Sequence, residues 1–407
     1  MQYDLIVVGG GAAGFFGAIQ AAEMKPGLKI LILEKTNKVL SKVRVSGGGR
    51  CNVTHHDYNP FSLARHYPRG EKAVKKLFKT YHAEHVVKWF ASKDVLLKAE
   101  DDGRMFPVTD SSETIIECFL NETRRYNIKI QTGWEVNNIV AGLNCFHISS
   151  TSGETHKATK VLIAAGGNPK QQSYAWIASL HHSIAAPIPS LFTFNDSKKE
   201  FADLMGISVS SGEVKIEGTK FVQRGPILIT HWGLSGPAVI KLSAWAAEYL
   251  HSVNYTFTAL VNWVGGLSEE ETRAALHDMK ALRSRQKVNS DTLFAMPQRL
   301  SRRLCEIAGV DETKIWSELS VRTTNKLVEV LIRCPFHIKG KTTFKEEFVT
   351  CGGVELGEVN LARMESKKVK NIFFAGEVLN VDGETGGFNF QSAWSTAFIA
   401  ATAIVSE

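Results

Sequence analysis

The chain of 407 residues is 44% hydrophobic and 22% charged, a composition typical of a folded protein with two or three units and no low-complexity tract. Its formal net charge of +7 would suit an anionic partner, but the excess is spread thinly along the sequence. The clearest basic stretch, EKAVKKLFKTYH from Glu71, sets lysines opposite apolar residues at helical spacing. We interpret it as the solvated face of a helix rather than as a polyanion site.

The six cysteines form neither a CxxC pair nor a cluster with histidines at the spacing of metal ligands. We therefore expect reduced thiols and no metal. The chain starts in an apolar strand without a basic leader, and it has no uncharged apolar run of about 18 to 20 residues, the length that spans a bilayer. These features predict a cytoplasmic protein with no membrane partner.

A strand, a glycine turn and a helix open the sequence. Residues 3–8 are apolar and β-branched, GGGAAG follows at 9–14, and good helix formers continue to residue 24. A second apolar run at 28–33 closes on Glu34, about 20 residues after the turn, where an acidic side chain would bind an adenosine ribose. The pattern predicts a doubly wound α/β fold that binds a dinucleotide.

Each glycine of the turn has its own predicted task. Gly9 permits the tight turn, Gly11 lets the backbone approach a pyrophosphate, and Gly14 lets the helix pack closely on the strand. The N–H groups at the start of the helix, together with the positive end of its dipole, would then face the phosphates.

A second glycine run, SGGGRCN at 46–52, lies in a long polar segment at 35–60 that we predict to be a loop. Its glycines would let backbone approach a flat or charged ligand, and Lys42, Arg44 and Arg50 would supply charge for phosphate oxygens. We predict that this segment covers the far half of the same extended cofactor.

The motifs GGGAAG, Glu34-Lys35, SGGGRCN, DGRMFP at 102–107, GLSGPA at 233–238 and AGEVLNVDGETGGFNFQ at 375–391 occur in the order found in one family. The chain resembles, from end to end, the HI0933-like flavoproteins, a bacterial family typified by a Haemophilus protein. The resemblance implies FAD, held by a Rossmann-like domain of the glutathione reductase type with a large insertion. It also implies a backbone contact from Val136 to adenine and a contact from Asp382 to the ribityl chain or a phosphate-bound water.

The C-terminal stretch carries a further expectation. An apolar strand at 371–375 ends at Gly376-Glu377, and Gly386-Gly387 open a last helix through residue 399. The N–H groups of that helix would point at the flavin pyrimidine edge, where negative charge accumulates on reduction. The strand VLIAAGG at 161–167 would bring another glycine pair to the cofactor.

The expected cofactor contacts come from all of these segments. They are Gly9, Gly11, Ala12, Ala13, Gly14, Glu34, Lys35, Lys42, Arg44, Ser46, Gly47, Gly48, Gly49, Arg50, Cys51, Asn52, Val136, Ala165, Gly166, Gly167, Gly376, Glu377, Asp382, Gly386, Gly387, Phe388, Asn389 and Gln391.

Between residues 190 and 345 the pattern changes to short β-rich pieces followed by helical periodicity. We predict an FAD-binding domain at 1–190 and 345–407, a β-barrel domain at 191–267 and 325–344, and a helical subdomain at 268–324. No second dinucleotide fingerprint occurs in the insertion, so we expect NAD(P)H to bind as a transient donor or not at all.

Three residues are candidates for chemistry. His231, in THWGLSGPA, could act as an acid or base or be a packing histidine. Arg104 could bind a substrate carboxylate or carbonyl, or pair with Asp101 or Asp102. Cys51 could be a redox thiol, but a small packed residue is the favoured interpretation. His231 and Arg104 are the predicted catalytic residues.

These features predict an FAD-dependent oxidoreductase that transfers a hydride between flavin N5 and a small organic substrate. An oxidase of an amine or aminoketone and an NAD(P)H-linked enone reductase both remain open, since both activities are attached to the family that the chain resembles. The alternative is an RNA-binding or RNA-modifying flavoprotein, which the positive charge and the predicted barrel suggest. Interspersed acids at 269–271, 278 and 291 argue against a continuous basic track, so a nucleic acid partner is not favoured.

Overall fold

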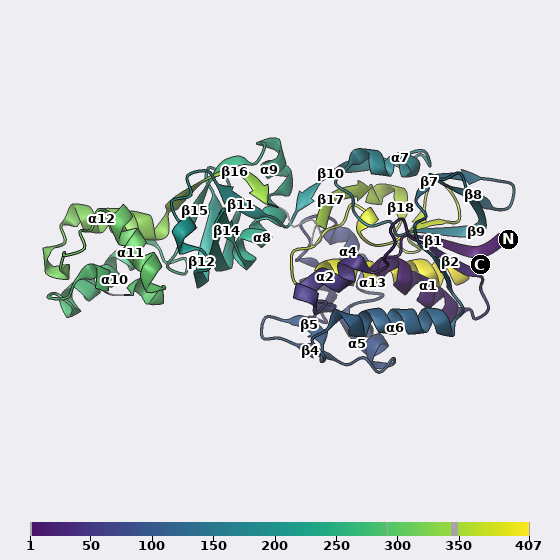
Figure 1. The fold of residues 1–407 in the computed structure, drawn as a ribbon, viewed down its shortest axis with the longest axis horizontal. Coiled ribbons are helices and arrows are strands. Elements are labelled where there is room, and N and C mark those ends of the chain that lie inside the picture. The colour runs from purple at the N-terminus through teal and green to yellow at the C-terminus, as the bar shows by residue number, and fades with distance from the viewer. Residues whose placement is uncertain (1, 291, 343–348, 407) are drawn as a thin grey trace. The chain divides into compact units, whose positions relative to one another are not determined.

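The chain divides into two compact units, which are shown in Figure 1. The computed structural model describes residues 2–290, 292–342 and 349–406. Unit 1 consists of Met1–Ser190 and Phe344–Glu407, and unit 2 of Leu191–Thr343. Each unit has its own cluster of buried hydrophobic side chains. The second predicted domain boundary, at 344/345, lies outside the described residues.

A nine-stranded sheet forms the centre of unit 1 (Figure 1). Its parallel part has the order β20-β9-β1-β2-β6, with β1 (Gln2–Val8) between β2 (Ile30–Leu33) and β9 (Thr155–Ile163). β6 (Lys129–Gln131) and β20 (Ile372–Phe374) flank these three strands. The antiparallel strands are β7 (Val136–Ala141), β8 (Phe146–Ser150), β18 (Val359–Asn360) and β19 (Glu365–Ser366). The arrangement is Rossmann-type, which confirms the predicted fold class.

The central strands are continuous apolar runs because side chains are buried on both of their faces. All four residues of β2 and the last four of β1 are buried. α1 (Ala12–Met24) and α13 (Phe388–Val405) lie side by side against the sheet (Figure 1). A Cβ on Gly17 of α1 would lie 2.6 Å from a Leu162 methyl group, so glycine lets the helix approach β9 without moving that side chain. α13 ends at Val405, beyond the predicted end at residue 399.

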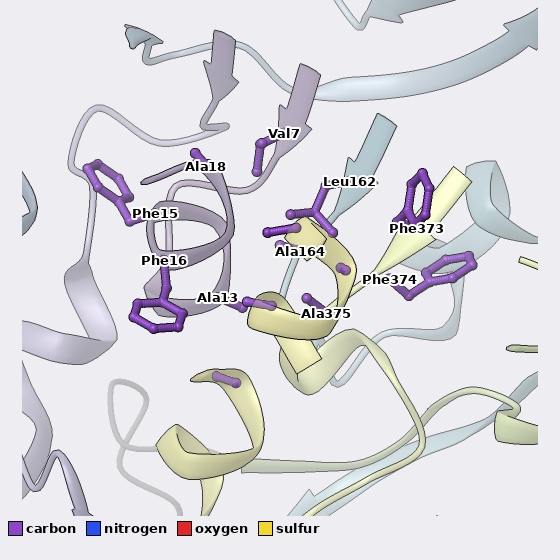
Figure 2. Close-up of a cluster of buried hydrophobic side chains, with 14 of the residues drawn as sticks. Val7, Ala13, Phe15, Phe16, Ala18, Leu162, Ala164, Phe373, Phe374 and Ala375 are labelled. Carbon is purple, nitrogen blue, oxygen red and sulfur yellow. The ribbon is translucent and has the colours of Figure 1, made fainter. Parts of the chain in front are cut away.

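The core of unit 1 is rich in aromatic rings. Trp394 of α13 is fully buried, its ring centroid lies 5.4 Å from that of Phe16 and 5.6 Å from that of Phe119, and its Nε1 donates to the Val53 carbonyl at 2.9 Å. Figure 2 shows the neighbouring part of the core, where Ala13 of α1 lies near Ala375, just after β20. The two ends of the chain therefore share one core.

The segment at 35–60, predicted to be a single loop, contains α2 (Ser41–Gly49). The helix is regular only at its start, since Ser46, Gly47 and Gly48 have non-helical backbone angles. The loop prediction is wrong for the first turn of α2. This turn is helical because the side chains of Leu40 and Val43 are buried in the core of unit 1. The glycine run itself is irregular.

The remaining elements of unit 1 are short. The basic stretch forms α4 (Glu71–Leu77), with Ala73, Val74 and Leu77 buried, as its helical spacing predicts. The other elements are α3 (Pro60–Ala64), α5 (Ala83–Ala91), α6 (Ser112–Arg125), α7 (Ala175–Ala178), β3 (Thr54–His55), β4 (Leu97–Ala99), β5 (Arg104–Pro107), β10 (Ile184–Ser190) and β17 (Val349–Val354).

Unit 2 contains a closed barrel with the strand order β11-β14-β13-β12-β15-β16. The strands are β11 (Thr193–Asp196), β12 (Ser208–Ile216), β13 (Val222–Thr230), β14 (Gly233–Ser235), β15 (Thr256–Asn262) and β16 (Cys334–Thr342). Two helices belong with them, α8 (Pro237–Trp245) and α9 (Ala247–Ser252).

The helical part of unit 2 comprises α10 (Glu269–Leu282), α11 (Gln298–Ile307) and α12 (Val321–Ile332). Residues 325–332 were assigned to the barrel by the predicted domain limits, but they complete α12, whose buried Leu327, Val328 and Leu331 repeat at helical spacing. Within the described ranges, no helix has both the length and the apolar character needed to cross a bilayer.

Replacing Gly14 with alanine should destabilise unit 1. The added Cβ would lie 1.9 Å from the carbonyl oxygen of Gly9, and we expect the clash, about 1–3 kcal/mol, to exceed the gain of about 1 kcal/mol in helix propensity. Thermal unfolding of the variant should therefore occur at a lower Tm. Gly357→Ala is the matched control, because a Cβ there meets no atom within 4 Å. Equal Tm values for the two variants would contradict this account.

His182 should make the stability of unit 1 depend on pH. Its side chain is fully buried, with Nε2 2.8 Å from Ser366 Oγ and Nδ1 3.3 Å from Glu358 Oε2. Burial lowers the pKa of His182, and the neighbouring Glu358 opposes this only in part. Because the pKa is lower in the folded than in the unfolded chain, the stabilisation is present above about pH 6.5 and is lost as the pH falls through the folded pKa.

The Tm of the wild-type protein should therefore fall more steeply between pH 8 and pH 5 than that of His182→Gln. Differential scanning fluorimetry across this range measures both slopes. Parallel slopes would show that His182 does not couple protonation to folding.

Candidate functional site

Four of the glycines predicted to contact the cofactor border open space. A Cβ placed on Gly11, Gly48, Gly49 or Gly166 would meet no other atom within 4 Å. Gly11 and Gly166 follow the carboxyl ends of the adjacent parallel strands β1 and β9, which is where open α/β sheets bind ligands. The N–H of Leu40 donates to the carbonyl of Gly10 at 2.8 Å and so ties the start of α2 to the first glycine turn.

Glu34 lies at the end of β2, beside the same turn. Its Oε2 accepts from the N–H of Gly10 at 2.8 Å, and its Oε1 accepts from the N–H of Thr36 at 2.9 Å. A carboxylate has about four acceptor positions, so these donors leave capacity for a ribose hydroxyl. The N–H of Trp134 donates to the Glu34 carbonyl at 2.9 Å, which brings the start of β7, with Val136, to this end of the sheet.

Glu377 links three of the predicted segments. Its Oε1 accepts from the N–H of Thr350 at 2.8 Å, and its Oε2 pairs with Nζ of Lys42 at 2.6 Å. A Cβ on Gly167 would lie 2.6 Å from Oε1 of Glu377, so the backbone after β9 passes this carboxylate closely. Lys42, Gly167 and Glu377 are thus brought together.

The second glycine run is joined to the start of α13. With the amide of Asn52 oriented so that both of its atoms have partners, Oδ1 accepts from the N–H of Gly387 at 3.0 Å and Nδ2 donates to the Thr54 carbonyl at 3.0 Å. Thr54 Oγ1 donates to Oε1 of the fully buried Gln391 at 2.6 Å. A Cβ on Gly387 would lie 2.5 Å from backbone atoms of Thr54, which requires glycine there.

Asp382 is fully buried, and its carboxylate is bound by protein donors. Nε of Arg69 donates to Oδ1 at 2.6 Å, a second guanidinium nitrogen of Arg69 pairs with Oδ2, and Ser190 Oγ donates to Oδ2 at 3.0 Å. Burial raises the pKa of Asp382, and Arg69 acts against this rise. In the structure, the carboxylate of Asp382 binds the guanidinium group of Arg69. The predicted contact of Asp382 with the cofactor stays a prediction.

The arginines predicted to carry charge for the ligand are paired with carboxylates. Arg44 pairs with Glu113, and Arg50 pairs with Glu100 at 2.6 Å. Arg104, a predicted catalytic residue, pairs with Asp102 at 2.7 Å and with Glu100 at 3.0 Å. Both Arg50 and Arg104 lie over the ring of Phe106.

Cys51 is buried, and desolvation raises the pKa of its thiol to about 12, so the thiol is protonated at neutral pH. The second predicted catalytic residue, His231, is exposed at the turn between β13 and β14 of unit 2, with its ring against Trp232. The remaining predicted contacts lie on the segments already described: Gly9, Ala12, Ala13, Gly14, Lys35, Ser46, Gly47, Ala165, Gly376, Gly386, Phe388 and Asn389.

The structure also reveals a cluster that the sequence analysis missed. The rings of His55 and His66 stack on Phe388, the first residue of α13, with centroid distances of 4.7 and 4.2 Å. His55 Nδ1 lies 3.1 Å from the Gly386 carbonyl oxygen, and His66 Nδ1 lies 3.3 Å from Oε1 of Glu384. No sequence motif predicts this cluster, because His66 and Glu384 are 318 positions apart in the chain.

These residues fit FAD. Open glycine backbone after β1 and β9 and in the α2 segment suits a pyrophosphate and a flat ring, and Glu34 suits a ribose. The first-turn N–H groups of α13 have no acceptor within that helix and would face a group on which negative charge develops.

Comparisons with known proteins agree with this architecture. The family described as "HI0933-like protein Rossmann domain" matches residues 3–403. A 3-dehydro-bile acid delta(4,6)-reductase of Clostridium scindens is 25% identical over 405 residues, covering 98% of each chain. A ribosomal RNA dihydrouridine synthase of Escherichia coli is 26% identical over 415 residues, covering 100% of this chain and 98% of the relative.

Among solved structures, a 3-ketosteroid delta1-dehydrogenase from Sterolibacterium denitrificans aligns with a TM-score of 0.53 at 13% identity. The alignment covers 100% of this chain and 99% of that one. At this identity the likeness concerns the fold alone.

Gly11→Ala should separate cofactor binding from folding. Gly11 has φ −95°, which alanine adopts freely, and a Cβ there meets no protein atom. The methyl group would instead enter the space assigned to the pyrophosphate, so we expect the Kd for FAD to rise about tenfold or more, equivalent to about 1.4 kcal/mol. Flavin fluorescence titration of the apoprotein measures the Kd. Thermal unfolding of the apoprotein should give the same Tm for the variant and for the wild type. An unchanged Kd would remove Gly11 from the cofactor site.

Proposed function

The chain belongs to the HI0933-like family, and from that premise we propose that it is an FAD-dependent oxidoreductase that reduces a carbon–carbon double bond conjugated to a carbonyl group. The bound FAD would supply two-electron hydride chemistry. The protein would supply binding, orientation and control of the proton. The observation that carries the cofactor assignment is the open backbone of Gly11 between β1 and α1, with the carboxylate of Glu34 beside the same turn.

The first turn of α13 supports this function. Asn52 and Thr54 hold the start of the helix in place, and the buried Gln391 fixes its first turn from inside. A helix N-terminus stabilises nearby negative charge by about 0.3 to 2 kcal/mol, which would favour the reduced form of a flavin placed there.

The names of two relatives support the type of reaction. A delta(4,6)-reductase of a 3-dehydro bile acid removes double bonds conjugated to the 3-oxo group, and a dihydrouridine synthase saturates the uracil C5–C6 bond, which is conjugated to the C4 carbonyl. Reduction of such a bond by hydride adds the hydride to the carbon β to the carbonyl, or to the vinylogous δ-carbon of a dienone, and adds a proton to a carbon nearer the carbonyl. We propose the same type of reaction for this chain and consider the oxidation of amines the less favoured function.

The substrate class divides the proposal in two. A small-molecule enone is the first candidate, with NAD(P)H as the transient electron donor. A uracil base in RNA is the second candidate, which is favoured by the name of the Escherichia coli relative and by the net charge of +7.

Anaerobic half-reactions test the proposal. The purified holoprotein should be yellow, NADH or NADPH should bleach its flavin band, and a 4-en-3-one steroid or unmodified ribosomal RNA should restore the band without oxygen. If RNA is the substrate, the observed affinity should fall steeply with salt, because each phosphate contact releases a counterion.

In the same experiment, amines test the competing oxidase function. Bleaching by an amine alone, with peroxide formed on aeration, would replace the reductase with an oxidase. A colourless protein that takes up no FAD would exclude both activities.

A further inference from the structure

His66 lies just after α3 in a loop held rigidly against the start of α13. The N–H of Glu384 donates to the His66 carbonyl at 2.9 Å, and the Tyr67 hydroxyl donates to the Phe388 carbonyl at 2.5 Å. Two positions further on, Arg69 is bound by the buried Asp382. The backbone on both sides of the His66 ring is therefore fixed.

The ring itself has one defined orientation. It stacks on Phe388 with an interplanar angle of 10°, and its Nδ1 lies 3.3 Å from the carboxylate of Glu384, which is only 8% exposed. Nε2 points to the other side and has no hydrogen-bond partner in the described part of the chain. A third of the side chain is open to solvent, so the ring is accessible to a ligand.

The position of the ring links it to the proposed flavin site. Phe388 directly follows Gly386 and Gly387, and the neighbouring His55 is bonded to the Gly386 carbonyl. Burial lowers the pKa of His55, which favours its neutral form, whereas His66 has the carboxylate of Glu384 as its partner. The two histidines therefore differ in their partners, which are a backbone carbonyl for His55 and a carboxylate for His66.

We propose that His66 is the proton donor of the reductase, oriented by Glu384 as a positioning residue, an inference that rests on the proposed function. When a hydride reaches the β-carbon, the π bond breaks and its electron pair moves to the α-carbon and the carbonyl. The Nε2–H bond of the protonated ring then breaks, and a C–H bond forms at the α-carbon. The ring becomes neutral and recovers its proton from water. A reduced nicotinamide supplies the two electrons.

Chemical labelling tests the position of His66 without turnover. Diethyl pyrocarbonate modifies accessible imidazole nitrogens, and peptide mass spectrometry reports the rate at each histidine. His66 should react in both forms, but about threefold or more slowly in the holoprotein, since the bound cofactor shields part of the ring while Nε2 stays open to the substrate. His277, whose side chain is 83% exposed in unit 2, is the internal reference and should react equally in both.

Separate half-reactions test the chemical role. In His66→Gln holoprotein, reduction by NADPH should stay within about threefold of wild type, while reoxidation by the enone should slow about 100-fold or more. Glu384→Gln keeps an acceptor for Nδ1 but removes the charge, so reoxidation should slow less than in His66→Gln, while reduction by NADPH should stay near the wild-type rate. His277→Gln should behave as wild type in both half-reactions.

Equal labelling of His66 with and without FAD, or undiminished reoxidation of His66→Gln, would overturn the proposal. If the wild-type protein reduced no conjugated substrate, the proposed function would fail, and the proton-donor role with it. The labelling result would then still show whether the His66 ring lies at the flavin.

Discussion

The connection between the second glycine run and the first turn of α13 is the constraint on which the site depends. Asn52 bonds to Gly387, Tyr67 to Phe388 and Arg69 to Asp382, the last two across 321 and 313 positions of sequence. Because these partners come from opposite ends of the chain, the cofactor site cannot be completed until both parts of unit 1 have folded together. The insertion of unit 2 between them is compatible with this order, since unit 2 has its own hydrophobic core.

The glycines of unit 1 serve two separate physical needs. At Gly9 and Gly14 a Cβ would lie within 2.2 Å of a backbone oxygen, so these residues let the strand, the turn and the helix pack. At Gly11 and Gly166 a Cβ would meet nothing, so packing of the chain does not explain the absence of a side chain. Gly166 has φ +71°, which itself favours glycine, whereas Gly11 has φ −95° and neither its backbone nor its packing requires glycine. A ligand that approaches the backbone would account for Gly11.

The parts that sequence predicts well are those whose evidence is local. The strand, the glycine turn, the helix and Glu34 lie within a single crossover unit, so periodicity and spacing are enough to place them. The helical start of α2 was missed because only Leu40 and Val43 anchor it. The cluster of His66, Glu384 and Phe388 has no local pattern, because its members meet only when distant segments pack.

The pairing of the cations changes how an anionic cofactor would be held. Lys42, Arg44 and Arg50 each have a carboxylate partner, so their charges are largely balanced within the protein. Recognition of a pyrophosphate would then depend chiefly on backbone N–H groups and on the dipole of α1, whose directions are fixed by the fold. Such a site would select its ligand by shape more than by charge. A fixed array of N–H donors can bind both phosphates of a pyrophosphate at once, whereas a single small anion would make fewer of these hydrogen bonds.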